Sequence, residues 1–294
     1  MRISNETIDR IYCNRTVRPS DYRMAENHSH NYYEIYYVEK GNTRFFVDDR
    51  LFDLHTGDYM IVPPNLVHYN RYITQTARVN IYFRDIDLHR GDSYVLEDMK
   101  PRYLEKAAMY HTPSSHKDLL DKVIDMMLHE DKVNDEKTEV MMQLLFQEFF
   151  ILSSRYCTTN SGYSKEIAEE GDISIQEAAL YISEHYNLPI TLNFLAEKSG
   201  LSPAYFSKRF HLITGMGMKE YLTYVRLKHA EAELVSTSHS IREIAENSGF
   251  SDSNYFKDVF KKEFGMSPRS YRNSRKTDFV EGRNRIAKTI PNDF

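Results

Sequence analysis

Tryptophan is absent from the 294-residue chain, and cysteine occurs only twice. Cys13 and Cys157 lie far apart and match no metal-binding or redox spacing, so we expect free thiols in a reducing compartment. No run approaches the roughly 20 apolar residues of a membrane-spanning helix, and the start of the chain lacks the apolar core of a signal peptide. These absences predict a cytoplasmic protein that does not contact a membrane.

The composition is that of a globular protein, and its charge is unevenly distributed. Hydrophobic residues make up 41% and charged residues 28% of the chain, and its length favours two domains. The net charge is −5, but residues 1–172 carry 21 Lys and Arg against 29 Asp and Glu, whereas residues 173–294 carry 17 against 14. A polyanionic partner would therefore meet the second part of the chain.

The first part changes from a strand pattern to a helix pattern. Short runs rich in Tyr, Phe, Val and Ile, broken by Gly, Pro and Asp, extend from Asn31 to Phe83 and predict a β-sandwich or barrel. Two later segments, near 116–130 and 135–156, have apolar residues three and four apart, which predicts helices. In the second helix Val140, Phe146 and Phe150 widen the apolar surface. It either packs one face on the sheet or uses a second face for a homodimer.

The remaining residues predict a linker followed by an all-helical domain. Residues 157–172 are polar and unpatterned, and helical segments follow, with Thr191, Ser202, Ser240 and Asp252 at expected N-caps. Glycines 200, 215, 249 and 265 follow expected helix ends. The predicted domains are 1–156 (barrel about 10–110, helices about 115–156), the linker 157–172, a helical domain 173–276 and a polar tail 277–294.

The helical domain contains one short sequence motif twice. "LAEKSGLSPAYFSKRF" and "IAENSGFSDSNYFKDVF" share an alanine, a Ser-Gly turn, and a second helix that carries Tyr-Phe and a further Phe. Small residues at the turn let two helices cross closely, which predicts helix-turn-helix units whose second helices fit the major groove of DNA. The helical segment 218–235 between them would be roughly 27 Å long, comparable to the ~34 Å between successive major grooves.

These segments, together with "YLTYVRLKHAEAEL" and the tail "GFSDSNYFKDVFKKEFGMSPRSYR", resemble the DNA-binding domain of the AraC family of bacterial transcription regulators over roughly residues 173–276. The resemblance implies double-stranded DNA as a partner, with base-facing positions on both second helices. These positions, with Arg209 beside them for phosphate, are Ala204, Tyr205, Ser207, Lys208, Ser253, Asn254, Lys257 and Asp258. Asp258 departs from the basic or polar residue of many relatives, which puts base reading by the second helix in doubt.

The end of the repeat adds basic residues. Lys261, Lys262, Arg269 and Arg272 would anchor the DNA backbone, or would simply form a solvated helix face.

The first part also carries a resemblance. "HSHNYYEIYYVEKG" holds His28, His30 and Glu34, and "GDYMIVPPNLVHYN" holds His68, in the arrangement of the two motifs of the cupin barrel. Asn65 stands where the second motif usually has glycine, and Asn often tolerates such a turn.

The resemblance implies a cupin-like effector domain, as usually accompanies this DNA-binding domain. The implied effector site consists of His28, His30, Glu34, Tyr36 and His68. Lining an effector site is the favoured role, and no cofactor is expected. Alternatively, His28, His30, Glu34 and His68 would bind Fe, Mn, Ni or Zn, or the histidines would be merely structural.

The expected fold is therefore multi-domain α+β, with an N-terminal cupin-like β-barrel followed by helices and a C-terminal all-α double helix-turn-helix domain. The favoured function is a non-enzymatic, homodimeric regulator that responds to a small, sugar-like effector. Activation, with RNA polymerase as a further partner, follows from the family resemblance. The alternatives are a metal-dependent cupin enzyme with an appended helical domain, and a helical adaptor that binds protein.

Overall fold

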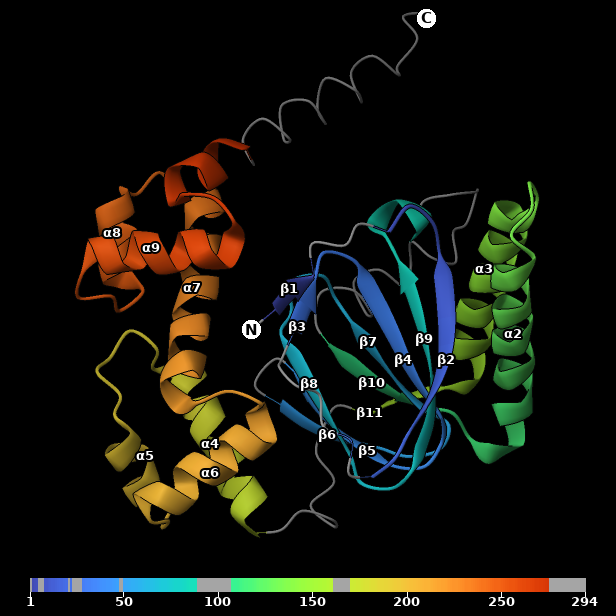
Figure 1. Cartoon of the computed structure of the whole chain (residues 1–294), viewed down its shortest axis with the longest axis horizontal. Coiled ribbons are helices and arrows are strands. Elements are labelled where there is room, and N and C mark those ends of the chain that lie inside the picture. The colour runs from blue at the N-terminus through green and yellow to red at the C-terminus, as the bar shows by residue number, and fades with distance from the viewer. Residues whose placement is uncertain are drawn as a thin grey trace, which may run out of the picture. The chain divides into compact units, whose positions relative to one another are not determined.

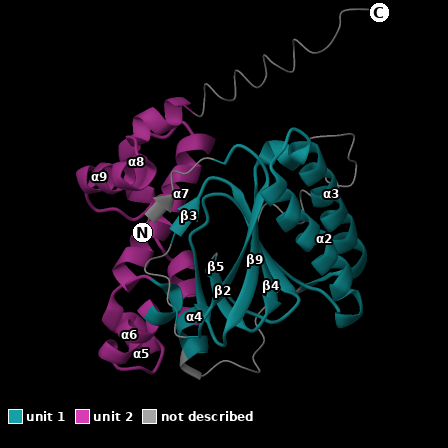
Figure 2. Cartoon of the chain, turned by 45° about the vertical axis from the view of Figure 1, so that its right-hand side comes forward, with its two compact units in different colours: residues 1–176, 212–215 teal, residues 177–211, 216–294 magenta. Residues whose placement is uncertain are grey.

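The computed structural model describes residues 2–4, 8–20, 22, 28–47, 50–88, 107–160 and 170–274 (Figure 1). The chain divides into unit 1, residues 1–176 with 212–215, and unit 2, residues 177–211 with 216–294 (Figure 2). The predicted linker, residues 157–172, overlaps regular structure at both ends. Residues 158–160 form a strand, and a helix starts at Glu170. Linker residues 161–169, the predicted tail 277–294 and segment 89–106 of the predicted barrel lie outside the described residues.

Unit 1 is built on two β-sheets. The first has the strand order β1-β3-β8-β5-β6 and the second β11-β10-β7-β4-β9-β2. The strands are β1 (Arg2–Ser4), β2 (Tyr12–Arg18), β3 (His28–His30), β4 (Tyr33–Lys40), β5 (Thr43–Val47), β6 (Arg50–Leu54), β7 (Asp58–Val62), β8 (His68–Tyr72), β9 (Thr76–Phe83), β10 (Ala108–His111) and β11 (Thr158–Asn160). A short 3₁₀ helix, η1 (Asp85–Leu88), follows β9.

The predicted β domain with following helices is confirmed, but the prediction of a closed barrel is wrong. The described strands form two open sheets, each with its own edge strands. A sandwich and a barrel both bury one face of every strand, so the alternation of residues could not distinguish them.

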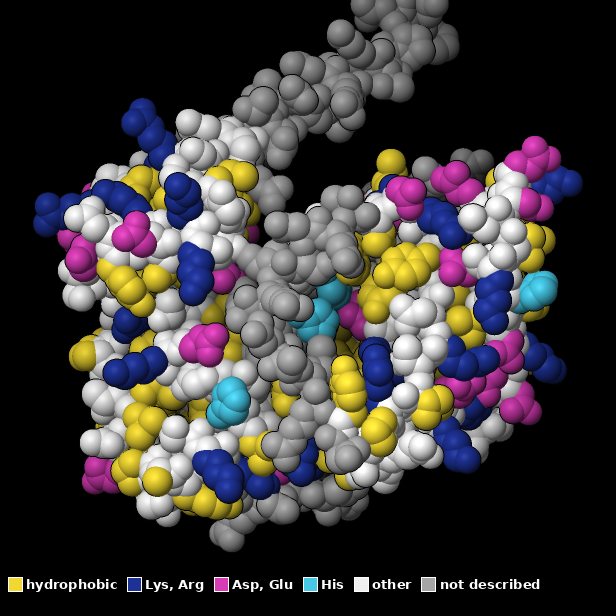
Figure 3. Space-filling model, in the orientation of Figure 1, with side chains coloured by type: hydrophobic (Ala, Val, Ile, Leu, Met, Phe, Trp, Pro, Cys, Tyr) yellow, Lys and Arg dark blue, Asp and Glu magenta, His cyan; other side chains and the backbone are white. Residues whose placement is uncertain are grey.

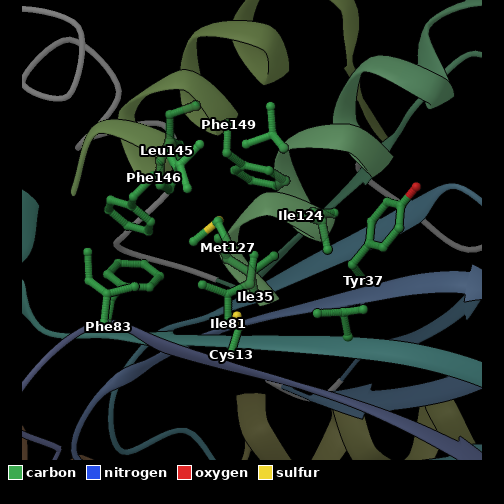
Figure 4. Packing of buried hydrophobic residues seen from close by; sticks show 14 of the residues in the cluster. Cys13, Ile35, Tyr37, Ile81, Phe83, Ile124, Met127, Leu145, Phe146 and Phe149 are labelled. Carbon is green, nitrogen blue, oxygen red and sulfur yellow. The ribbon is translucent and has the colours of Figure 1, made fainter. Parts of the chain in front are cut away.

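Strand β4 is buried on both faces. Ile35 and Tyr37 point to a core shared with the helices α2 (Ser114–Val133) and α3 (Thr138–Tyr156), whereas Tyr36 and Val38 belong to the core between the sheets. Figure 4 shows Ile35, Tyr37, Ile81 and Phe83 from the strands against Ile124, Met127, Leu145, Phe146 and Phe149 from the helices. The two helices therefore cover the outer face of the second sheet, which is the first of the two roles expected for the second predicted helix.

Unit 2 is helical. Its helices are α4 (Glu170–Glu184), which starts in unit 1, α5 (Leu192–Lys198), α6 (Pro203–Thr214), α7 (Met218–Ser236), α8 (Ile241–Asn247) and α9 (Ser253–Phe264). The side chains of the four predicted N-cap residues accept hydrogen bonds from backbone N–H groups: Thr191, Ser202, Ser240 and Asp252. No described helix is long and apolar enough to cross a membrane.

The two turns of the repeat differ in their surroundings. Gly200 and Gly249 both have a positive φ, 66° and 82°. A Cβ at Gly200 would meet no atom within 4 Å, whereas a Cβ at Gly249 would lie 2.8 Å from Asn187 Cα and 2.9 Å from the Tyr186 carbonyl oxygen. The second turn is thus packed against the chain that follows α4.

Replacing each glycine by alanine tests this difference. Both substitutions strain the backbone, at a cost of about 1 kcal/mol or more in the free energy of unfolding. Gly249→Ala should cost more than Gly200→Ala, because backbone atoms must also move. Urea unfolding followed by circular dichroism measures both; equal losses would contradict the close packing at Gly249.

Candidate functional site

The first helix-turn-helix unit consists of α5 and α6. Phe206 and Phe210 are fully buried on one face of α6, which fixes the opposite face outward. Of the residues predicted to face bases, Ala204, Tyr205, Ser207 and Lys208 are exposed, and Arg209 is half-buried.

The second unit consists of α8 and α9 and repeats this arrangement. Phe256 and Phe260 are fully buried, and Asn254, Lys257 and Asp258 are exposed beside the half-buried Ser253. Lys261, Lys262 and Arg269 are exposed as well. Figure 1 shows α7 running between the two helix pairs, and Figure 3 shows Lys and Arg side chains spread over the face of unit 2 that is in view.

Arg226, in the middle of α7, links the segment between α4 and α5 to the turn of the second helix pair. Its guanidinium donates hydrogen bonds to the carbonyl oxygens of Tyr186 (2.7 Å) and Leu188 (2.9 Å) and lies 5.9 Å from the ring of Phe250. On the same helix, His229 stacks on Tyr186 with ring centroids 3.7 Å apart. The sequence does not indicate this role, because bonds to distant carbonyl groups leave no sequence signal.

Arg272, predicted to anchor the DNA backbone, also has an internal role. It donates hydrogen bonds to the carbonyl oxygens of Leu234 (3.2 Å) and His239 (2.6 Å). These bonds hold the segment around residue 272 against the C-terminal end of α7. A phosphate contact would use its remaining N–H groups, and that contact stays a prediction.

In unit 1 the residues predicted for the effector site come together between the two sheets. His28 and His30 lie on β3, Glu34 on β4 and His68 on β8, and their nearest ligand-type atoms lie within 4.8 Å of one another. We call these four residues the histidine–glutamate cluster. His30 Nε2 lies 2.9 Å and His68 Nε2 3.3 Å from Glu34 Oε2. Burial and the neighbouring His68 lower the pKa of His28 to about 3, which keeps its imidazole neutral near pH 7.

Further polar side chains continue from this cluster along the same inner faces. Asn80 on β9 donates a hydrogen bond of 2.6 Å to Glu34 Oε1, and Asn70 on β8 has a buried Oδ1 that has no hydrogen-bond partner among the described residues. Arg78 has its guanidinium 5.0 Å from the ring centroid of Tyr36, and within the described part of the chain its Nε also lacks a hydrogen-bond partner. Apolar residues complete the space between the sheets: Val38, Phe45, Val47, Phe52, Leu54, Met60 and Val62. The inner faces of the sheets therefore carry both polar and apolar side chains, a mixture that is typical of ligand sites.

Sequence reasoning did not select Asn70, Arg78 or Asn80 for this site. The signal that could have found them is period two: Arg78, Asn80 and Tyr82 alternate with the buried Val79, Ile81 and Phe83, which face α2 and α3.

Two other arginines of unit 1 are paired with carboxylates. Arg44 pairs with Asp53 (2.6 Å) and with Asp172 in the first turn of α4, and Arg84 pairs with Asp87 (2.9 Å). Their charges are largely matched by these carboxylates, whereas the guanidinium of Arg78 lies over the ring of Tyr36, which belongs to the core between the sheets.

Comparison with known proteins assigns both halves of the chain. Residues 13–146 match the family model of the AraC-like ligand binding domain, and residues 195–274 match that of a helix-turn-helix domain. The chain belongs to the AraC family of transcription regulators. It is a DNA-binding transcription factor rather than an enzyme, so the alternative of a metal-dependent cupin enzyme is wrong.

Curated relatives match most of the chain. The transcriptional activator RhaR of Cronobacter sakazakii is 27% identical over 83% of this chain and 86% of that protein. The uncharacterised transcriptional regulator YisR of Bacillus subtilis is 25% identical over 85% of this chain and 90% of that protein. Among solved structures, the C-terminal domain of the response regulator AraT of Geobacillus stearothermophilus is 36% identical over 35% of this chain and 85% of that chain, with a TM-score of 0.34.

Proposed function

We propose that this AraC-family regulator is a cytoplasmic transcription activator that reads DNA with both α6 and α9 and responds to a small polyhydroxylated metabolite bound between the sheets of unit 1. The observation that carries the proposal is the pairing of two outward polar helix faces with one buried polar site. Activation, with RNA polymerase as the further partner, is supported by relatives such as RhaR, which is described as an activator.

The helices α6 and α9 would contribute differently to DNA binding. Lys208 is exposed on α6 and can reach the acceptor atoms of guanine, and Asn254 on α9 can pair with adenine. Asp258 is exposed on α9, where it would repel phosphate but could accept a hydrogen bond from cytosine. With Lys261 and Lys262 exposed at its end, α9 would serve more to anchor the backbone.

Alanine substitution of Lys208 and Lys261 tests these roles with a matched pair of exposed lysines. Lys208→Ala should relax sequence preference at one base pair, with a loss of about 1–3 kcal/mol there. Lys261→Ala should weaken binding to all sequences alike and reduce the slope of log affinity against log salt by about 1. Selection from a randomised DNA pool, followed by affinity titration at several salt concentrations, measures both. The same profile for both variants, or wild-type affinity independent of salt, would contradict the proposal.

The chemistry of the interior favours a ligand with several hydroxyl groups. Asn70 Oδ1 accepts no hydrogen bond within the described residues, and Arg78 Nε donates none. Burial raises the pKa of Tyr36 well above its usual value, so its hydroxyl keeps its proton. The rings of Phe45 and His68 stack with centroids 5.7 Å apart, and aromatic surfaces of this kind pack well against the apolar face of a sugar. A sugar-like molecule would use both the polar and the apolar side chains of these inner faces.

A thermal-shift screen against sugars and sugar acids tests the effector site. A ligand that binds only the folded protein at about 100 times its Kd stabilises it by about 2.7 kcal/mol and raises Tm by several degrees. Asn70→Leu should abolish the shift in Tm, because it removes the Oδ1 and Nδ2 atoms of Asn70 from the effector site. Asn247→Leu, on α8 in unit 2, should retain the shift. A shift that survives Asn70→Leu would place the effector elsewhere.

A homodimer through α2 and α3 is the second part of the proposal. Leu119, Met126 and Val133 recur every seven residues along α2 and are 38–53% exposed, and Val140, Met141 and Leu144 on α3 are 43–65% exposed. Apolar residues in such a stripe are typical of helix packing between subunits. A second copy of the chain is the proposed partner because a two-fold axis would pack this stripe against the same stripe of the other subunit.

A matched pair of exposed valines tests the dimer. Val140→Glu on α3 should weaken self-association at least about tenfold, because a carboxylate would be buried between subunits. Val17→Glu on β2, where the valine is 58% exposed, should leave self-association unchanged. Sedimentation velocity over a concentration series measures both; a monomeric wild type at all concentrations, or an unchanged Val140→Glu dimer, would contradict this interface.

A further inference from the structure

We infer that the histidine–glutamate cluster binds one first-row transition-metal dication. The sequence favoured an effector site without a metal ion. The hydrogen bonds that surround the cluster instead favour metal binding. The inference concerns the same site as the proposed effector.

The hydrogen bonds of His30 and His68 fix which ring nitrogen carries a proton. His30 Nδ1 lies 2.7 Å from the carbonyl oxygen of Tyr32, and His68 Nδ1 lies 3.0 Å from the carbonyl oxygen of Leu66. A carbonyl oxygen only accepts hydrogen bonds, so each Nδ1 must be the donor. In a neutral imidazole the Nε2 of each ring is then left with its lone pair.

Those two lone pairs are directed at a third acceptor. His30 Nε2 and His68 Nε2 lie 2.9 and 3.3 Å from the same oxygen, Glu34 Oε2. The other carboxylate oxygen, Oε1, is occupied by the hydrogen bond from Asn80. The side chains of Glu34, His30 and His68 are at most 4% exposed, so bulk water does not compensate the three converging acceptors.

One bound cation would satisfy all three converging acceptors. Protons could satisfy the three acceptors only if both His30 and His68 were cationic. That is unfavourable because the two buried rings would repel each other, with centroids only 5.1 Å apart. One dication would accept all three lone pairs, and the ring of His28, centred 4.3 Å from that of His68, supplies a fourth ligand.

The spacing of the ligand atoms also fits one ion. With bonds of about 2.1 Å, neighbouring ligands of one ion lie about 3.0–3.4 Å apart and opposite ligands about 4.2 Å apart. The observed 2.9 and 3.3 Å match the first values, and the overall spread of 4.8 Å requires a small closure. The bonds from Nδ1 to carbonyl oxygens and from Asn80 to Glu34 correspond to the outer contacts that orient metal ligands.

The donor set restricts the metal. Three imidazoles and one carboxylate suit Zn²⁺, Fe²⁺, Co²⁺, Ni²⁺ or Mn²⁺, whereas Mg²⁺ and Ca²⁺ prefer oxygen ligands throughout. Four protein ligands leave positions free on an ion that takes five or six, so an effector oxygen could complete its coordination.

Metal binding to the full-length, tag-free chain tests the inference. The protein is dialysed against EDTA, returned to chelator-free buffer and titrated separately with Zn²⁺ and Co²⁺. Bound metal is measured by mass spectrometry of the elements after gel filtration, and the Co²⁺ absorption spectrum reports the ligands. We expect one ion per chain, a higher Tm for the loaded protein, and a loss of affinity of at least about 100-fold in His68→Gln and Glu34→Gln.

His111→Gln is the matched control. His111 Nδ1 also pairs with a buried carboxylate, that of Asp58 at 2.6 Å, but lies outside the cluster, so this variant should bind metal like the wild type. Should His68→Gln fail to fold by circular dichroism, Asn80→Ala replaces it. That variant keeps all four ligands but frees Glu34, and it should lose about tenfold in affinity.

Two results would overturn the inference: a wild-type chain that retains no metal after gel filtration, or equal affinity in His68→Gln and the wild type. Neither measurement uses DNA or effector, so a failure here leaves the regulator function untouched. Conversely, loss of DNA binding would not alter the metal content.

Discussion

The double burial of strand β4 is the constraint on which unit 1 depends. Because successive side chains point to opposite faces, Ile35 and Tyr37 hold the helices α2 and α3, while Glu34 and Tyr36 enter the space between the sheets. A shift of the strand by one residue would exchange these two sets. The packing of the helices and the polar site are therefore fixed by the same register, which pairs Glu34 with Val62 and with Tyr82.

The same alternation explains which parts of the site could be predicted. His28, His30, Glu34 and His68 were recognisable because they form a known motif, and the structure brings them together. Asn70, Arg78 and Asn80 belong to no motif, and their role depends on which face of β8 and β9 they occupy. Sandwich and barrel bury strands in the same way, which is why the closure of the sheets could not be read from the residues.

In unit 2 the prediction from sequence reaches further, because local chemistry determines more of the structure. N-cap side chains and glycines with positive φ mark helix ends within a few residues, and the four caps were expected from the sequence. What local chemistry does not contain is the joint between the two helix pairs. Arg226, Gly249 and Tyr186 are distant in sequence, and only the fold shows that they meet.

Where both helix pairs read DNA, as proposed above, that joint has a consequence for the DNA sites that the protein can use. One additional base pair between two half-sites moves the second by about 3.4 Å and rotates it by about 34–36° around the duplex. With Arg226 tied to the Tyr186 and Leu188 carbonyl groups, and no space for a side chain at Gly249, the second helix pair has little freedom to follow such a displacement. Operators could then exchange individual bases over evolutionary time, whereas insertions and deletions between the half-sites would be eliminated.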